Sequence, residues 1–185
     1  MQSKLRLRKL NESDQSMVKN WRMMPEVTQF MYTDPVITDE SQKIWFRSIE
    51  YNDKVLYWII TFDNVDIGLL SITKIDYNNK RCDWAYYIAD SQFQGKGIGR
   101  NLECNIYDFV FYTLELNKLC CEVMSNNYRV VEIHQHFGSS VEGKRVEHIW
   151  KDDECFDIYE MAITKSKWDQ IKSSYTYEKI EIEYP

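Results

Sequence analysis

The stretch of sequence that decides the fold runs from Tyr86 to Arg100 and reads YYIADSQFQGKGIGR. Its first residues are aromatic and β-branched, which is typical of a strand. Its last residues open a segment, 98–114, that has the length and apolar spacing of a long amphipathic helix. Between the two lie three of the six glycines of the chain, Gly95, Gly97 and Gly99. The stretch therefore predicts a strand, a glycine-rich turn and a helix.

A glycine-rich turn at the start of a helix is suited to binding an anion. Glycine allows the backbone to approach a ligand closely, the N–H groups of the first helical turn converge, and the helix dipole favours negative charge. Lys96 and Arg100 add positive charge, so we expect a phosphate there rather than only a tight connection. No Gly-Lys-Ser/Thr of a Walker loop is present, and the turn comes too late in the chain for the dinucleotide fingerprint.

The rest of the pattern predicts an α/β (α+β) fold: helices near the start, an antiparallel meander of strands, then alternating helices and strands around a mixed sheet. Residues 11–14 and 38–41 supply cap-type side chains for the first two helices, and Asp63-Asn64 is typical of a hairpin turn. The predicted strands are 5–10, 55–62, 65–75, 81–89, 119–124, 144–150 and 155–163. The predicted helices include 17–21, 44–49, 98–114, 126–137 and the segment after Thr164.

Composition limits the class of protein. The 185 residues, 44% of them hydrophobic, suffice for one core, and no linker divides them, so residues 1–185 are expected to form a single domain. No apolar run approaches the ~20 residues that span a bilayer, and the first ten residues lack a signal core, which predicts a cytoplasmic protein with no membrane partner. The net charge of −6 argues against a nucleic-acid partner.

Cysteine and histidine spacing gives no metal motif. The five cysteines include no Cys-x-x-Cys pair and lie mostly in apolar segments, so we expect small buried side chains. His134 and His136 are two residues apart on a predicted helix and point to different sides, which argues against a shared metal ion.

The glycine-rich turn and its neighbours resemble the GNAT (GCN5-related N-acetyltransferase) superfamily. Its coenzyme A loop has the pattern Gln/Arg-x-x-Gly-x-Gly/Ala, which Gln94, Gly97 and Gly99 match. Residues 86–89 are similar to the strand whose splayed end pairs with the pantetheine arm, and 127–138 resemble the helix after the next strand. The resemblance covers nearly the whole chain and implies a mixed, mostly antiparallel sheet of about seven strands, splayed in the middle. The residues that it implies for binding acetyl-CoA, without a metal, are Tyr87, Ile88, Ala89, Gln94, Gly95, Lys96, Gly97, Ile98, Gly99, Arg100 and Asn127.

A narrower resemblance concerns the acceptor. Residues 20–27, Met31, Trp45 and residues 72–75 are similar to the nucleotide-sugar N-acetyltransferases of pseudaminic acid biosynthesis. Those enzymes acetylate the free 4-amino group of a UDP-linked amino sugar. The resemblance implies that Met31 and Trp45 sandwich the base, an aromatic ring and a soft thioether being suited to a flat base.

The same resemblance implies that Arg22 and Gln42 face the diphosphate. Related enzymes tend to have a histidine where this chain has Gln42, so a hydrogen-bond donor is kept and a charge is lost. Lys74, at the end of a strand, is a candidate for a sugar hydroxyl or a phosphate, and Tyr86 is a candidate aromatic contact of the ligand.

Acetyl transfer from a thioester to an amine requires a neutral amine, a stabilised oxyanion and a proton for the leaving sulfur. The resemblance implies that the Ile88 N–H faces the thioester oxygen. In the family, the acid that protonates the leaving sulfur is a tyrosine four residues before the glycine that closes the helix. This chain has His134 at that position, and a histidine can also donate a proton. Ser71 and Thr73 share one face of a strand and are candidates to orient the amine or a water that relays its proton. Hydroxyls on a strand are about as often without a role in catalysis.

Other acceptors and roles stay open from the sequence. The acceptor is alternatively a protein N-terminus, notably a ribosomal one, an antibiotic or a polyamine. A polyamine enzyme favours an acidic groove, which the Trp21-Arg22 segment does not suggest. A noncatalytic module that binds acetyl-CoA is a further reading, and a homodimer is compatible with the sequence.

Overall fold

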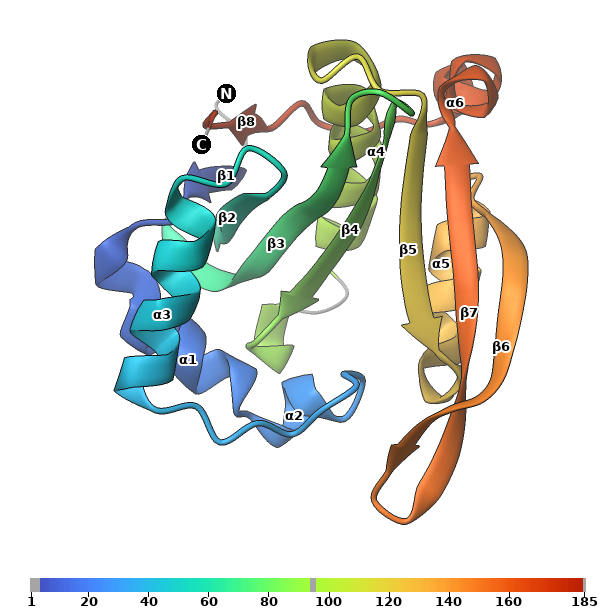
Figure 1. Cartoon of the computed structure of the whole chain (residues 1–185). Coiled ribbons are helices and arrows are strands. Elements are labelled where there is room, and N and C mark those ends of the chain that lie inside the picture. Colours follow the sequence, from blue (N-terminus) through green and yellow to red (C-terminus); the bar gives the residue numbers. More distant parts are fainter. Residues whose placement is uncertain (1–3, 94–95, 185) are drawn as a thin grey trace.

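The computed structural model describes residues 4–93 and 96–184 of the chain, and its helices lie on both faces of one twisted sheet (Figure 1). Within these residues the sheet has eight strands in the order β6-β7-β5-β4-β3-β2-β1-β8. The strands are β1 (Leu5–Lys9), β2 (Leu56–Phe62), β3 (Val65–Asp76), β4 (Arg81–Ile88), β5 (Lys118–Met124), β6 (Ser140–Lys151), β7 (Glu154–Thr164) and β8 (Glu181–Ile182). The helices are α1 (Gln15–Arg22), α2 (Pro25–Thr28), α3 (Asp39–Glu50), α4 (Ile98–Asp108), α5 (Tyr128–His136) and α6 (Lys165–Ile171).

The sheet is mixed and mostly antiparallel, which confirms the predicted class. Strands β1 to β4 form an antiparallel meander, and β5, β7 and β6 form a second antiparallel set. Between β2 and β3, Asp63 and Asn64 have φ angles of 50° and 63°. Two consecutive left-handed residues are what a tight hairpin turn requires, so the predicted turn is confirmed.

Two apolar clusters hold helices to opposite faces of the sheet. On one face, Val18 of α1 and Phe46 of α3 pack against Ile59 and Leu69 of β2 and β3. On the other face, residues of α4 and α5 form a larger cluster with the intervening side chains of the same strands. Its members include Trp58, Leu70, Ile72, Trp84, Leu102, Ile106 and Val131. Full burial of such a side chain contributes about 1.5–3 kcal/mol. Because successive side chains of a strand point to opposite faces of the sheet, the same strands hold one layer of helices on each face.

Three elements differ from the sequence prediction. The short helix α2 was not predicted, and the predicted helix 98–114 continues beyond α4 as a π-helical segment, Phe109–Thr113. The two-residue strand β8 pairs in parallel with β1, opposite Arg6 and Leu7. Two residues in an acidic tail show no strand pattern in the sequence. The position of β8 is therefore set by its tertiary contacts with β1.

The described residues contain no helix long and apolar enough to cross a membrane. All five cysteines are free; Cys82, Cys104 and Cys121 are buried as predicted, whereas Cys155 is exposed at the start of β7. Gln94 and Gly95 lie outside the described residues.

The central feature for function is the separation of β4 from β5. These parallel strands pair only at Arg81–Lys118, Cys82–Leu119 and Asp83–Cys120. Beyond these pairs the two strands diverge, and Figure 1 shows them spreading apart toward α2. The divergence opens the sheet in the middle, as the sequence predicted.

Candidate active site

A cleft of about 1130 Å³ follows the divergence of β4 and β5. Its walls are the last residues of both strands, the start of α4, one side of α5, part of α2 and the C-terminal segment at Thr176–Glu178. The lining includes ten of the residues singled out in the sequence: Met31, Tyr86, Tyr87, Ile88, Gly97, Ile98, Gly99, Arg100, Asn127 and His134. The fold thus brings most of the predicted cofactor residues to one cleft.

The start of α4 forms one end of the cleft. Gly97 precedes the helix with a φ of 76°, a left-handed conformation that side chains rarely adopt. Ile98, Gly99 and Arg100 of the first turn line the cleft, so their free backbone N–H groups and the positive end of the dipole open toward it. Lys96 lies over the ring of Phe93, its Nζ 4.7 Å from the centroid. This end of the cleft is therefore suited to an anion such as a phosphate.

The end of β4 directs a backbone donor into the cleft. An added Cβ on Gly68 of β3 would lie 2.0 Å from the carbonyl oxygen of Tyr87, so that carbonyl points toward β3. In a trans peptide the following N–H points the opposite way. The N–H of Ile88 therefore points toward the gap between β4 and β5. A glycine at position 68 permits this close approach.

His134 of α5 lines the cleft from the face covered by α4 and α5. It is only 4% exposed, and its Nδ1 lies 2.8 Å from Oε1 of Glu103, a carboxylate of α4 that is 0% exposed. The ring N–H is not aligned on that oxygen, so the contact is an ion pair rather than a well-formed hydrogen bond. Burial lowers the pKa of His134, but Glu103 and Cys121 raise it more, and the pKa lies well above its ordinary value.

Ser71 and Thr73 lie on the opposite face of the sheet from His134. They alternate with Leu70 and Ile72, whose side chains belong to the α4–α5 core, so their hydroxyls face the side of α1 and α3. The Ser71 hydroxyl is 3.5 Å from the Ala85 carbonyl oxygen of β4. The predicted shared face of the two hydroxyls is therefore present, and it is separate from the predicted acid.

The predicted acceptor residues form a group beside the cleft. Trp45 of α3 packs edge-on against Tyr57, with ring centroids 5.4 Å apart, in the same cluster as Tyr87. Arg22 is half-buried next to Tyr87; burial lowers its pKa, and the neighbouring Tyr87 and Asp34 raise it. The Arg22 guanidinium donates to the Thr33 carbonyl oxygen at 3.3 Å.

Two polar atoms of this group are buried without a partner. Gln42 of α3 is only 5% exposed, and neither its Nε2 nor the Tyr87 hydroxyl meets a hydrogen-bond partner in the described residues. A buried donor without an acceptor is costly, and such atoms are rare in folded proteins. We name Gln42, Tyr87 and Arg22, together with Trp45 of the same cluster as Tyr87, the acceptor group.

The remaining candidates lie outside the cleft lining. Lys74, with a φ of 51°, binds Asp83 through its Nζ at 2.6 Å, and Ala89 is buried with its N–H bound to the Ile67 carbonyl at 2.8 Å. Met31 lines the cleft whereas Trp45 does not, so the structure does not bring the two proposed base contacts to one wall. The described residues hold no cluster of three or more metal-ligating side chains.

Sequence reasoning missed several residues of the site. Glu103 was not singled out because it lies in an apolar stretch of α4; its spacing of four residues before Tyr107 was a usable signal, since both lie on one helix face. Glu26 and Glu122, which line the cleft, were missed as well. Tyr32 donates to Glu122, and Arg145 pairs with Glu122 at 2.5 Å.

A splayed sheet with a glycine-capped helix at the splay defines a fold that binds an acyl-CoA thioester. The model of the Acetyltransferase (GNAT) domain matches residues 4–140, and the chain belongs to this family. It is therefore an acyltransferase that uses acetyl-CoA to acetylate a small-molecule amine.

Two acetyltransferases are similar to most of the chain. The chain is 26% identical to spermidine N(1)-acetyltransferase of Vibrio cholerae over 169 residues, 91% of this chain and 97% of the relative. It is 26% identical to acetyltransferase PseH of Campylobacter jejuni over 149 residues, 79% of this chain and 91% of the relative. The structure of the Vibrio cholerae spermidine enzyme with CoA and spermine has a TM-score of 0.83 and 22% identity, covering 89% of this chain and 98% of that one. This last likeness establishes the fold.

Proposed function

We propose that the whole chain acts as one acetyltransferase that acetylates the 4-amino group of a UDP-linked amino sugar, as in pseudaminic acid biosynthesis. The observation that carries this proposal is the acceptor group: Gln42 Nε2 and the Tyr87 hydroxyl are buried without partners, and Tyr87 lies next to the positively charged Arg22. A diphosphate and a sugar offer several acceptor oxygens, which would satisfy these donors. Tyr87 also lines the cleft, so a ligand bound there reaches the site of transfer.

The residues have separate roles in the proposed reaction. The amine nitrogen attacks the thioester carbon, and the Ile88 N–H stabilises the charge that develops on the thioester oxygen. The C–N bond forms as the C–S bond breaks, and His134 gives a proton to the departing sulfur. The amine nitrogen loses its extra proton to water, which the Ser71 and Thr73 hydroxyls orient on the opposite face.

Cofactor binding has its own residues in the proposal. Gly97, Ile98, Gly99 and Arg100 bind the pyrophosphate, with Asn127 at the start of α5 across the cleft. The strand end at Tyr87 and Ile88 pairs with the pantetheine arm. Ala89 and Lys96 support this wall from behind, and Gln94 and Gly95 belong to the same loop by the motif alone.

The proposal is tested with purified protein, acetyl-CoA and two acceptors, a UDP-linked 4-amino sugar and spermidine, with thiol release and product mass as readouts. Replacing Gln42 by Leu keeps the volume and removes the unpartnered amide. We expect the melting temperature to rise, because a buried unsatisfied donor is removed, and KM for the nucleotide sugar to rise about tenfold, with KM for acetyl-CoA unchanged. A gain of stability with a loss of acceptor binding is the signature of a ligand site.

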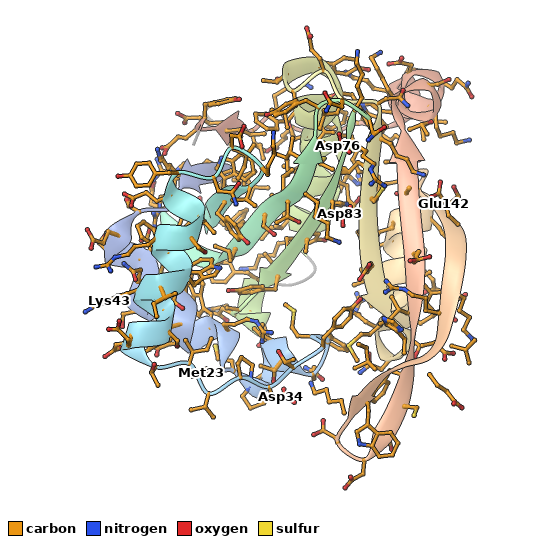
Figure 2. All side chains as sticks on the ribbon, viewed as in Figure 1. Met23, Asp34, Lys43, Asp76, Asp83 and Glu142 are labelled. Atoms are coloured by element: carbon orange, nitrogen blue, oxygen red, sulfur yellow. The ribbon has the colours of Figure 1, made fainter. Side chains whose placement is uncertain are left out.

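Lys43→Ala is the matched control, because Lys43 is next to Gln42 on α3 but points away from the sheet (Figure 2). It should change neither KM. Unchanged KM for the nucleotide sugar in Gln42→Leu would contradict the proposed acceptor group.

A polyamine is the second candidate acceptor. Glu26 of α2 is an exposed carboxylate that lines the cleft, and the relative of Vibrio cholerae named above is a spermidine enzyme. The other cleft carboxylate on this side, Glu122, is already paired with Arg145 at 2.5 Å, which weakens the acidic groove. Turnover on spermidine alone, with a raised KM for spermidine in Glu26→Gln, would favour this candidate over the nucleotide sugar.

A further inference from the structure

One buried carboxylate next to the cleft has no place in the reaction described so far. Glu103 of α4 is 0% exposed and does not line the cleft. Its Oε2 accepts a hydrogen bond from the Tyr107 hydroxyl at 2.6 Å, and that hydroxyl lies 3.2 Å from the Ser139 hydroxyl. Its Oε1 faces Nδ1 of His134 at 2.8 Å. Among the described residues no lysine or arginine pairs with Glu103.

A carboxylate buried this deeply requires a positive partner. Removing an isolated carboxylate from water is costly, and only a well-placed opposite charge and hydrogen bonds offset that cost. His134 is the group within reach that can carry the charge. Burial opposes the charge, but Glu103 and Cys121 outweigh it, so the pKa of His134 is well above the ordinary value of a histidine.

Three other titratable side chains lie near the pair of His134 and Glu103. Cys121 on β5 interacts with His134, and Tyr107 on α4 and Tyr86 on β4 interact with Glu103. Burial and the nearby Glu103 raise the pKa of both tyrosines, so they remain neutral. The Trp84 ring packs against the His134 ring, with centroids 5.5 Å apart, and adds no charge.

We propose that Glu103 is a positioning residue that keeps His134 in the imidazolium form and directs its Nδ1 away from the cleft, so that Nε2 delivers the proton to the leaving sulfur. This inference rests on the proposed role of His134 as the acid. It resolves a conflict of pH: an amine is nucleophilic only when deprotonated, and an ordinary histidine, with a pKa of about 6.5, has lost its proton at the pH where amines become neutral.

The proton balance of the step is simple. Nε2 of His134 loses its proton to the thiolate of coenzyme A as the C–S bond breaks. The ring becomes neutral, with its remaining proton on Nδ1, which faces Glu103. Water returns a proton to Nε2 before the next turnover. The Tyr107 hydroxyl holds the second carboxylate oxygen of Glu103, and the Ser139 hydroxyl lies beside that of Tyr107, which fixes the direction in which Glu103 faces.

The first test reads the charge of His134 without turnover. The chain has three histidines, so the side-chain NMR signals of His134 can be assigned with a His134→Gln variant and followed against pH. We expect the wild-type His134 ring to stay protonated well above the pH of about 6.5 at which an ordinary histidine loses its proton. In Glu103→Gln the charge partner is lost and burial remains, so the ring should titrate below about 6.5. Titration of wild-type His134 near 6.5 would overturn the proposal, even if the variant failed to fold.

The second test reads the same residue in catalysis, as the pH profile of kcat for thiol release. The alkaline loss of activity, where the acid deprotonates, should move at least one pH unit lower in Glu103→Gln, with KM for acetyl-CoA within about twofold of the wild type. Glu132→Gln, an equal change of charge at an exposed position of α5, should leave the profile unchanged. A loss in Glu103→Gln that is equal at every pH would show a structural role only and would reject the proposal.

A test in the His134→Tyr variant separates the role of Glu103 from the proposed function. In His134→Tyr the family's usual acid is restored, and a neutral phenol does not need a carboxylate partner. Adding Glu103→Gln to that variant should no longer shift the profile. If neither acceptor is turned over, the proposed substrate is wrong while the NMR titration still decides on Glu103. If His134→Ala keeps full kcat while the titration behaves as expected, the acid role fails, and with it this inference.

Discussion

Gly68 lies where β3 comes closest to the β4 peptide that borders the cleft. Replacing Gly68 by Ala would place a Cβ 2.0 Å from the Tyr87 carbonyl oxygen, which is a backbone atom and can move only with its strand. The peptide that carries the Ile88 N–H must then rotate or shift. Loss of one oxyanion donor typically costs about 10²–10³ in kcat. We expect a loss of this order, measured as thiol release at saturating acetyl-CoA, together with a lower melting temperature.

Gly143→Ala is the matched control for this prediction. Its Cβ would also meet an atom at close range, 2.7 Å, but that atom is Oε2 of Glu160, the far end of a flexible side chain. Both the melting temperature and kcat should change little. An active Gly68→Ala enzyme with wild-type kcat would contradict the assignment of the Ile88 N–H.

Single residues of the candidate site can be predicted from the sequence in two cases: where the backbone requires a particular residue type, and where the residue holds a known position in a motif. Gly97 is recognisable because a glycine-rich turn must precede a helix, and its φ of 76° agrees. His134 is recognisable by its distance from Gly138. The pairing of Glu103 with His134 is not recognisable, because it depends on the packing of α4 against α5, a contact between residues far apart in the chain. Partners across helices leave no local pattern.

At the scale of elements, Asp108 at the end of α4 holds the C-terminal segment in place. It accepts from Trp168 Nε1 at 3.0 Å and from the Tyr177 hydroxyl at 2.6 Å, and it pairs with Lys172 at 2.7 Å and with Lys179. Thr176–Glu178 of that segment line the cleft. Asp108 therefore connects the stability of the tail with the binding of acetyl-CoA.

Asp108→Asn should lower the free energy of unfolding by about 2 kcal/mol at pH 7, since several hydrogen bonds to a charged group are weakened. Burial raises the pKa of Asp108, but the four donors lower it more, so the folded pKa lies below the ordinary 3.8. The carboxylate therefore stabilises the fold fully above about pH 4, and this stabilisation is lost as pH falls through the folded pKa. The difference between wild type and variant should shrink accordingly.

Denaturant titrations between pH 7 and pH 3 measure this difference, and KM for acetyl-CoA should rise in the same variant. Asp169→Asn is the control: this exposed carboxylate binds Lys165 and Tyr112 on the surface, so its loss should matter little. A stability difference that stays constant down to pH 3 would argue against an ionised Asp108 as the anchor.

Elements with a strong local signal were predictable, and those placed by tertiary contacts were not. The β-branched and aromatic residues of 55–62 and 65–75 gave β2 and β3 almost to the residue, and the cap residues at Thr38 and Ser41 gave the start of α3. Helix α2 has four residues and β8 has two, too few for a period to be visible. Both are held by neighbours that only the folded chain supplies.

At the scale of the whole molecule, the cleft lies between two halves of the sheet that pair directly at only one end. At the other end, the segment around α2 bridges from the first half to the second (Figure 1). Tyr32 donates to Glu122 of β5, and Asn126 Nδ2 donates to the Gln29 carbonyl oxygen at 2.9 Å. The width of the cleft at the acceptor side thus depends on a short segment that was invisible in the sequence.

Lys151, at the end of β6, makes the strongest of these bridges. It is 8% exposed, and its Nζ donates to the Thr28 carbonyl at 2.6 Å and the Met31 carbonyl at 3.3 Å, and pairs with Asp34 at 3.0 Å. Lys151→Met keeps the apolar stem and removes the charge. The segment 25–34 should then detach more often, which would speed its backbone hydrogen exchange and raise KM for the acceptor about tenfold, with KM for acetyl-CoA unchanged.

Lys144→Met on the same strand is the control. It removes a charge that pairs with Asp157, at 2.6 Å, and should leave hydrogen exchange in 25–34 unaltered. Equal exchange in the two variants would mean that the bridge does not hold the cleft, and that the acceptor side is shaped by α1 and α3 alone.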